Sequence, residues 1–286
     1  MVANYRLYQI GQRIALSFPR KFAYLIAVAL SDIHYLFARH DKEAVRDNLR
    51  VIFPHKSERE IRRIRLRLFR NFAKYLVDFF CFSKLDRRFI QNHVRLMNLH
   101  YLDEALAREK GVISLSAHLG IWELGGAVIA QLGYPFWVVA LPHKDKNVND
   151  FFNFKRESKG VKVIPFGKAA RQCLRVLKEN EIVALVGDRD FAEKGIVVDF
   201  FGKKTYFPEG PGVFCVSTGA AIVPGFMLRN KDDSFTLRME QPMNPESGGD
   251  KNDAIRKTIL AYKPILEHFI REYPDQWFMF RRFWIA

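Results

Sequence analysis

Apolar and polar residues follow two different patterns along the chain. Up to about residue 95 the apolar positions recur at helical spacing. The stretch "SEREIRRIRLRLFRNFAKYLVDFFCF" opens with the residues of a capping box, Ser57 and Glu60, and an earlier helical stretch, "AVRDNLRVIF", stops at Pro54. The pattern therefore predicts a helical N-terminal region over residues 1–95.

From about residue 111 short apolar runs recur, and each ends in a polar residue, Gly or Pro. The runs are "VISLSAH", "FWVVALPHKD", "VKVIPFG", "IVALVGDRD", "AAIVPGF" and "FTLRMEQP". Helical stretches are expected at 119–131, 148–158, 169–179, 210–217 and 253–272. Strands that alternate with helices are typical of an α/β domain with a mostly parallel central sheet flanked by helices. We expect this domain over residues 96–286, with ligands at the carboxyl ends of the strands.

The composition of the chain indicates which kinds of partner it can bind. The 286 residues carry a formal charge of +15, and 14% of them are aromatic, including 26 Phe. Such a charge suits nucleic acid, an anionic membrane or an acidic protein. The excess of Phe beside Lys and Arg favours a surface that meets something both apolar and anionic.

The first long apolar stretch, Phe22–Leu30, is too short to span a bilayer, and Asp32 and His34 interrupt its continuation. It resembles a helix that lies in the membrane interface, with Arg20 and Lys21 at the headgroups. The alternative is an ordinary buried helix. We favour the interface because aromatic and basic residues surround the stretch.

The cysteines offer no metal site. Cys81, Cys173 and Cys215 stand far apart among apolar neighbours and share no ligand spacing with His. We expect them to be reduced core residues, which fits a protein that faces the cytosol, and we expect no structural metal.

The candidate chemistry begins with "AHLGIWELGG", which carries His118 and Glu123. Spaced by five, the two side chains would point apart on one continuous helix, so we place His118 at a strand-to-helix turn and Glu123 in the first turns of the helix. From there His118 can fold back to meet Glu123, which would fix its tautomer and stabilise the imidazolium. Ser114 and Ser116 precede the His, but no G-x-S-x-G elbow surrounds them. Without a nucleophile, such a pair suits direct deprotonation of a substrate hydroxyl; a structural His and a capping acid are the alternative.

Further polar residues follow other strands. Asp188 and Asp190 end an apolar run and could bind a sugar hydroxyl, pair with Arg189 or Arg156, or ligate a cation; we favour ionic pairing. Arg156 could form a bidentate fork with phosphate or pair with a nearby surface carboxylate. In "FPEG", Glu209 lies in a loop that faces either the cleft or solvent.

The chain resembles the lysophospholipid acyltransferase superfamily, and most closely its bacterial lipid A acyltransferase branch. The resemblance rests on "AVRDNLR", "AHLGIWELGG", "DRDFAEKGIVVDFFGKKTYFPEGPGVFCVSTGAAIVP" and "YPDQWFMFRRFW", and so spans nearly the whole chain. It implies an acyltransferase fold in which His118 and Glu123 form the catalytic His–carboxylate motif.

The resemblance also implies substrate-binding residues. Arg156 matches the basic residue of the second family block, which contacts the phosphate-bearing end of the acceptor, and Glu209 and Gly210 match the third block, which shapes the acceptor site. Pro211 replaces the Arg or Ser expected next, a departure that counts against a simple glycerol phosphate acceptor. The Asp188 to Asp190 segment stands where the family often has Asp-Gln-Asp, so Arg189 is a second departure.

We therefore expect an O-acyltransferase that needs no metal or other cofactor. The donor would be an acyl thioester of acyl carrier protein or coenzyme A, and the acceptor a membrane glycolipid such as a lipid A precursor, at the cytoplasmic face of the inner membrane. Alternatives are another acceptor, a phosphatidylinositol mannoside or a lysophospholipid, or a basic peripheral membrane protein without catalysis. No recognised nucleic-acid module occurs, so specific nucleic-acid binding is not expected.

Overall fold

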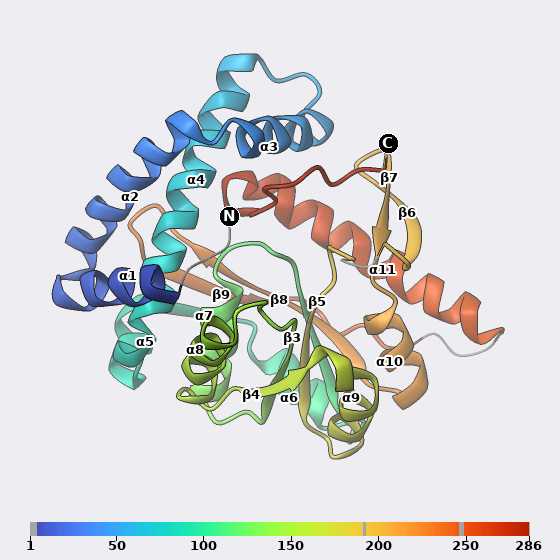
Figure 1. Ribbon diagram of the computed structural model, residues 1–286. Helices are drawn as coiled ribbons and strands as arrows, with labels where there is room; N and C mark the ends of the chain where they lie inside the picture. The colour runs from blue at the N-terminus through green and yellow to red at the C-terminus, as the bar shows by residue number, and fades with distance from the viewer. Residues whose placement is uncertain (1–4, 191–192, 246–248, 286) are drawn as a thin grey trace.

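The computed structural model describes residues 5–190, 193–245 and 249–285. Its centre is a seven-stranded sheet in the order β1-β9-β8-β2-β5-β3-β4 (Figure 1). The strands are β1 Val94–Met97, β2 Val112–Ser116, β3 Phe136–Ala140, β4 Lys162–Pro165, β5 Ile182–Val186, β8 Ala221–Arg229 and β9 Phe235–Met239. Strands β8, β2, β5, β3 and β4 run parallel, whereas β9 pairs antiparallel with β8 and β1 runs parallel with β9. The predicted α/β class with a mostly parallel sheet is confirmed.

Helices surround this sheet. They are α1 Tyr5–Ser17, α2 Arg20–Phe37, α3 Arg39–Ile52, α4 Glu58–Phe80, α5 Arg87–His93, α6 His100–Leu106, α7 Trp122–Gln131, α8 Lys146–Glu157, α9 Ala169–Lys178, α10 Gly210–Thr218 and α11 Lys251–Glu272, with short 3₁₀ turns η1 Cys81–Lys84, η2 Phe166–Lys168 and η3 Pro274–Gln276. The capping box of α4 forms as expected: the Glu60 N–H donates to Ser57 Oγ (3.3 Å), and the Ser57 N–H donates to the Glu60 carboxylate (2.9 Å).

The two faces of the sheet pack against different helices because side chains alternate along each strand. On β2, Val112 belongs to a core shared with α1, α4, α7 and α8, whereas Ile113 and Leu115 belong to a core shared with α9, α10 and α11. Figure 1 shows α1 to α5 gathered at one side of the sheet and α9 to α11 at the other.

A buried ionic cluster ties the N-terminal helices to the sheet. Arg229 of β8 pairs with Asp78 of α4, and both side chains are at most 5% exposed. Tyr24 of α2 donates to Asp78 and accepts from Arg229 (3.0 Å). Burial lowers the pKa of Arg229, but the charges of Asp78 and Tyr24 outweigh it and raise that pKa above its ordinary value. The cluster therefore joins three elements at one desolvated point.

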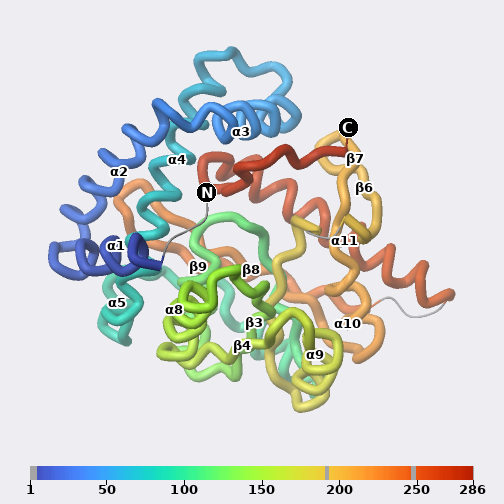
Figure 2. The backbone as a smooth tube through the Cα atoms, viewed as in Figure 1, coloured from blue at the N-terminus to red at the C-terminus, as the bar shows by residue number. Residues whose placement is uncertain are grey.

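The C-terminal segment lies beside helix α3 although the two are far apart in sequence (Figure 2). Asn48 of α3 donates to the carbonyls of Met279 (3.2 Å) and Arg281 (2.7 Å), and Ile285 donates to the Lys204 carbonyl (2.9 Å). The aromatic tail thus fastens α3 to the body of the molecule.

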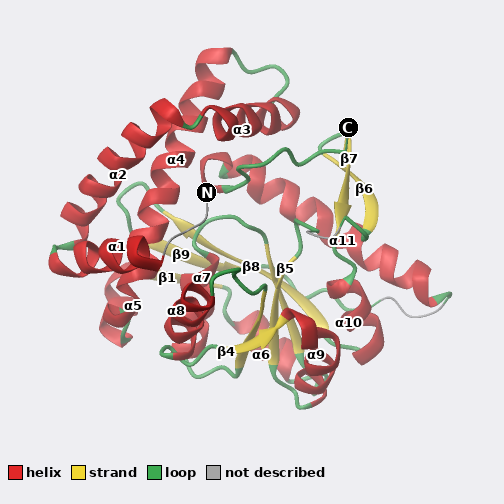
Figure 3. Ribbon diagram, in the orientation of Figure 1, coloured by secondary structure: helices red, strands yellow, loops and turns green. Residues whose placement is uncertain are grey.

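The structure differs from the sequence prediction at several places. Strand β1 begins at Val94, inside the region expected to be helical, because it adds to the edge of the sheet beside β9. A hairpin, β6 Ile196–Phe200 and β7 Lys203–Phe207, was not expected; it forms a sheet of its own (Figure 3). Cys173 and Cys215 are buried free thiols, whereas Cys81 is only half-buried. Burial raises the pKa of both Cys173 and Cys215 to about 12.

Candidate active site

A cavity of about 920 Å³ opens at the carboxyl ends of the parallel strands. Small side chains make room for it. Ser114, Ala184 and Val138 lie side by side across β2, β5 and β3, and all three line the cavity. Gly126 lets helix α7 pack closely on strand β3, because a Cβ at this position would lie 2.9 Å from the Phe136 ring.

His118 lies at one wall of this cavity, in the loop between β2 and α7 where the sequence placed it. Its Nδ1 lies 2.8 Å from Asp188 Oδ1, and its backbone N–H donates to both oxygens of the same carboxylate (3.1 Å each). Trp277 Nε1 also donates to Asp188 (2.9 Å). Because Nδ1 faces a carboxylate, the imidazole is held in the tautomer with its proton on Nδ1, which leaves Nε2 as the basic nitrogen.

Asp188 has no exposure to solvent. Burial alone would raise the pKa of this carboxyl, but the His118 ring and the hydrogen bonds from His118 and Trp277 lower it below its ordinary value. A fully buried carboxylate that stays ionised is a strong partner for an imidazole that takes up a proton. The geometry is that of a histidine base oriented by an aspartate.

Glu123 lies in the first turn of α7, as expected, but its partner is Arg156 of α8. The Arg156 guanidinium donates to both Glu123 oxygens, at 2.9 and 2.6 Å, and also to Asn153 Oδ1 (3.1 Å). The predicted contact between Glu123 and His118 is therefore wrong. The reason lies in the loop: Gly120 takes a φ of +64° and its N–H donates to the Gln276 carbonyl (2.9 Å), so His118 is turned toward β5 and not toward α7.

The Glu123–Arg156 ion pair is nearly buried, with side-chain exposures of 10% and 12%. Burial lowers the pKa of Arg156, but the charge of Glu123 and its hydrogen bonds raise it above its ordinary value. Tyr75 lies close to the pair, and its burial and the charge of Glu123 raise the pKa of Tyr75 well above its ordinary value. Both ions line the cavity and act on His143, another cavity residue, so the pair forms a polar patch among mostly apolar neighbours.

The remaining predicted residues reach the cavity in different ways. Asp188 pairs with His118 and Trp277, and its charge also acts on Arg189, one of the two partners expected for it. Arg156, the other expected partner, pairs with Glu123 instead. Asp190 lines the cavity and accepts hydrogen bonds from the backbone N–H groups of Lys194 and Gly195 (2.7 Å each), two residues that shortly precede β6. Glu209 and Gly210 also line the cavity, at the start of α10.

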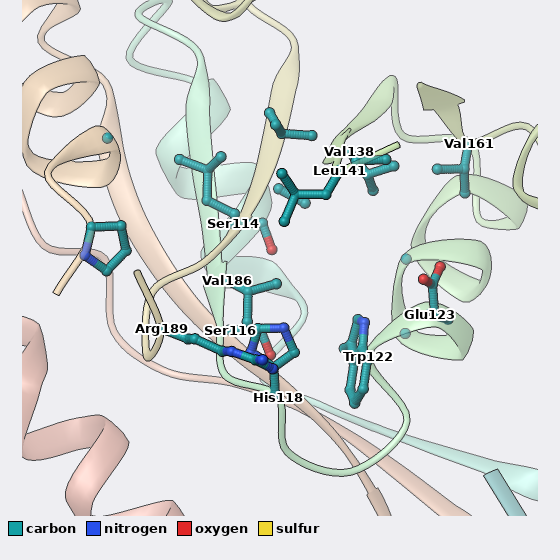
Figure 4. A pocket seen from close by; sticks show the side chains of 18 of the residues that line it. Ser114, Ser116, His118, Trp122, Glu123, Val138, Leu141, Val161, Val186 and Arg189 are labelled. Carbon is teal, nitrogen blue, oxygen red and sulfur yellow. The ribbon is translucent and has the colours of Figure 1, made fainter. Parts of the chain in front are cut away.

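The close-up view relates these side chains to one another. In Figure 4, His118 lies beside Ser116 and Arg189, and Trp122 stands next to it, with Glu123 farther along α7. The ring centroids of His118 and Trp122 are 5.3 Å apart. Arg189, which the sequence offered only as an ionic partner of Asp188 or Asp190, also lines the cavity. Burial lowers its pKa to about 10, so it carries its charge at neutral pH. Within the described ranges no group of three or more His, Cys, Asp or Glu side chains could hold a metal ion.

Comparison with known proteins shows which family the chain belongs to. The model of the bacterial lipid A biosynthesis acyltransferases matches residues 2–285. The phosphatidylinositol mannoside acyltransferase of Mycolicibacterium smegmatis is 28% identical over 220 residues, which cover 76% of this chain and 70% of that protein. The enzyme of the same name from Mycobacterium tuberculosis is 37% identical over 44% of this chain and 41% of its own length. The lipid A biosynthesis lauroyltransferase of Escherichia coli is 23% identical over 94% of this chain and 88% of its own.

Among solved structures, the 1-acyl-sn-glycerophosphate acyltransferase of Thermotoga maritima is similar with a TM-score of 0.41 and 13% identity, over 91% of this chain and 99% of the other. The family match extends over nearly the whole chain, including the loop of His118 and the strand end of Asp188. The chain belongs to the bacterial lipid A biosynthesis acyltransferase family and is an acyltransferase.

Proposed function

We propose that the protein moves a fatty acyl chain from an acyl thioester, on acyl carrier protein or coenzyme A, to a hydroxyl of a membrane glycolipid. The observation that carries the proposal is His118, held by the buried Asp188 at the wall of a large, mostly apolar cavity. A base in that position needs a substrate proton to remove, and the apolar cavity suits a fatty chain.

The chemistry follows from the two side chains. Nε2 of His118 removes the proton of the acceptor hydroxyl as its oxygen attacks the thioester carbonyl carbon. Asp188 stabilises the imidazolium that forms, and the imidazolium then gives its proton to the departing thiolate as the carbon–sulfur bond breaks. One ester forms and one thioester is consumed, so neither a metal nor a redox group is needed.

The apolar side chains of the cavity give the acyl chain a place. They include Ile129, Phe136, Val138, Val161 and Met239. These side chains offer no hydrogen bonds, so they favour a hydrocarbon over a sugar. The polar patch of Glu123 and Arg156 also lines the cavity, where a headgroup phosphate or hydroxyl can reach Arg156.

Two acceptor classes compete. The names of the relatives point to lipid A precursors and to phosphatidylinositol mannosides, which are both glycolipids. We place a lipid A precursor first because the family model describes lipid A biosynthesis and matches nearly the whole chain. Pro211, next to Glu209 and Gly210 at the cavity, counts against a small glycerol phosphate acceptor.

A panel of substrates tests the proposal. Purified protein in detergent is given myristoyl or lauroyl thioesters of acyl carrier protein and of coenzyme A, each with a radiolabelled lipid A precursor, a phosphatidylinositol mannoside or a lysophosphatidic acid. We expect transfer to a glycolipid at least ~10-fold faster than to the lysophospholipid, a ratio typical of discrimination by pocket contacts. Preference for the lysophospholipid would overturn the acceptor class while leaving acyl transfer in place.

We also propose that the protein binds the cytoplasmic face of the inner membrane through α1 and α2. Exposed apolar side chains on these helices include Leu25 (66%), Leu36 (70%) and Phe37 (80%). Exposed Lys21 and Arg39 lie beside them and suit anionic headgroups. Among the described residues no single helix is long and apolar enough to span a bilayer; α2 and α3 pass together by length and composition only, across a bend of 92°.

Removing this apolar surface should release the protein from lipid. The triple variant Leu25→Ser, Leu36→Ser, Phe37→Ser is expected to bind vesicles of phosphatidylglycerol and phosphatidylethanolamine about 10²-fold more weakly, since each exposed side chain contributes on the order of 1 kcal/mol. Vesicle flotation measures the change. The control is Leu260→Ser, which removes a partly exposed leucine of α11 on the other side of the sheet. Equal binding by the triple variant and the wild type would exclude this surface.

A further inference from the structure

The hydroxyl of Ser116, a residue that lines the cavity, is a buried group for which the described part of the chain offers no hydrogen-bond partner. Ser116 ends β2, precedes His118 by one pleat, and lines the cavity together with it. Its Oγ is shielded from solvent and finds no hydrogen-bond partner in the part of the chain that the structure describes. The backbone of the same residue is satisfied, because its carbonyl accepts the Gly187 N–H (2.8 Å).

An unpartnered buried hydroxyl is unfavourable, and native proteins rarely keep one without a use. The neighbours of Ser116 give it no packing reason. It stands opposite Val186 of β5, and Leu115 and Ile113 of the same strand are apolar and fully buried. An alanine at this position would keep the strand and avoid the cost of an unpaired hydroxyl. We therefore look for the hydrogen-bond partner of Ser116 in a ligand bound in the cavity.

We infer that Ser116 is a further catalytic residue, whose Oγ–H donates to the carbonyl oxygen of the bound acyl thioester and to the oxyanion that replaces it during transfer. This inference rests on the proposed acyl transfer. The thioester carbonyl accepts hydrogen bonds and donates none, so it needs a donor. Nε2 of His118, as the base, is an acceptor and cannot serve this oxygen.

The position of Ser116 matches the path of the acyl chain. One pleat deeper, Ser114, Ala184 and Val138 form the cavity floor that leads under α7. A carbonyl at Ser116 therefore lets the hydrocarbon extend over that floor toward Phe136, while the carbonyl carbon stays beside His118. Figure 4 shows Ser116 next to His118 and Ser114 farther into the cavity.

The step is balanced without any other reactant. The acceptor O–H bond breaks as its proton moves to His118, the new C–O bond forms, and the carbonyl π electrons move onto the oxygen that Ser116 binds. The electrons return as the C–S bond breaks, and the thiolate takes the proton from His118. Ser116 keeps its own proton throughout and forms no covalent bond.

A serine close to a histidine and an aspartate also raises the possibility of a nucleophile. The structure favours the donor role, since Ser116 Oγ makes no hydrogen bond to His118 that would remove its proton. A nucleophilic Ser116 would form an acyl-enzyme, which mass spectrometry detects. Its replacement by alanine would then abolish acyl transfer completely.

The test compares Ser116→Ala with Ser116→Thr, which keeps a hydroxyl, and with Ser83→Ala, an exposed serine of η1. Each full-length protein is mixed with myristoyl-coenzyme A and myristoyl acyl carrier protein that carry ¹³C at the carbonyl. Isotope-edited infrared spectroscopy reads the carbonyl stretch of the bound thioester, and kcat is measured with the best glycolipid acceptor. We expect the wild type, the Thr variant and Ser83→Ala to shift the band to lower frequency, and Ser116→Ala to lose that shift and about 10²-fold in kcat.

An unchanged carbonyl band and kcat in Ser116→Ala would overturn the inference, and so would an acyl adduct on Ser116 in the wild type. Thermal unfolding of each variant shows that the fold is intact. The infrared readout needs only a bound donor. A band shift that depends on Ser116, with no transfer to any glycolipid, would therefore support Ser116 while refuting the proposed acceptor.

Discussion

Replacement of His118 by alanine is expected to lower kcat for acyl transfer by at least about 10⁴-fold, because His118 is the cavity histidine whose ring is held by the buried Asp188 carboxylate. The radiolabelled transfer assay measures this loss directly. Exogenous imidazole should restore part of the activity, since it can enter the space that the side chain leaves.

The His118→Ala variant should fold. The backbone N–H of residue 118 and Trp277 Nε1 still donate to the Asp188 carboxylate, so that buried charge keeps hydrogen bonds after the imidazole is gone. Vesicle flotation and thermal unfolding serve as controls, and both should match the wild type. Turnover near the wild-type rate in a folded variant would remove His118 from the mechanism.

Asp188→Asn is expected to lower kcat about 10³-fold with little change in KM. The amide keeps the shape of the side chain but loses the charge that stabilises the imidazolium, and it can hold the ring in the wrong tautomer. The matched comparison is Glu123→Gln, which changes the carboxylate that sequence spacing assigned to His118. If Asp188 is the partner, the asparagine variant should lose far more kcat than the glutamine variant; the reverse order would restore Glu123 to that position.

The pH dependence of the Asp188 contribution has a definite sign. Because the pKa of Asp188 is lowered in the folded protein, its ionised form stabilises the fold at neutral pH. That contribution is present above the ordinary carboxyl pKa and is lost as the pH falls through the lower, folded value. Acid unfolding of wild type and Asp188→Asn compared over this range should show the wild type losing its advantage as the pH falls.

Much of the fold was predictable because its signals are local. The capping box of α4 and the short apolar runs of the sheet need only neighbouring residues to be recognised. The hairpin of β6 and β7 escaped because its strands pair only with each other, and the edge strand β1 escaped because it is short and flanked by helices. The predicted boundary at residue 95 falls within β1, and the helices before it share a core with the sheet.

The sequence allowed the residues of the site to be predicted, but not which of them pair with one another. Six of the predicted residues line one cavity: His118, Glu123, Arg156, Asp190, Glu209 and Gly210. The seventh, Asp188, pairs with His118 at its wall. Their pairing was not predictable, since His118 and Asp188 are 70 residues apart and meet through the order of β2 and β5 in the sheet. Trp277 belongs to the C-terminal segment that carries the family resemblance, but its role was not predictable, because its indole reaches Asp188 only after that segment has folded back.

The buried link among Arg229, Asp78 and Tyr24 sets a limit on how this protein can be handled. The helices that we assign to the membrane surface cannot be trimmed to make a soluble catalytic fragment, because their removal would take away Tyr24 of α2 and uncover the buried pair of Arg229 and Asp78 that links the sheet to α4. A soluble form has to keep both helices and exchange only outward-facing residues such as Leu36 and Phe37. Purification and crystallisation are thus problems of surface redesign, not of choosing where to cut the chain.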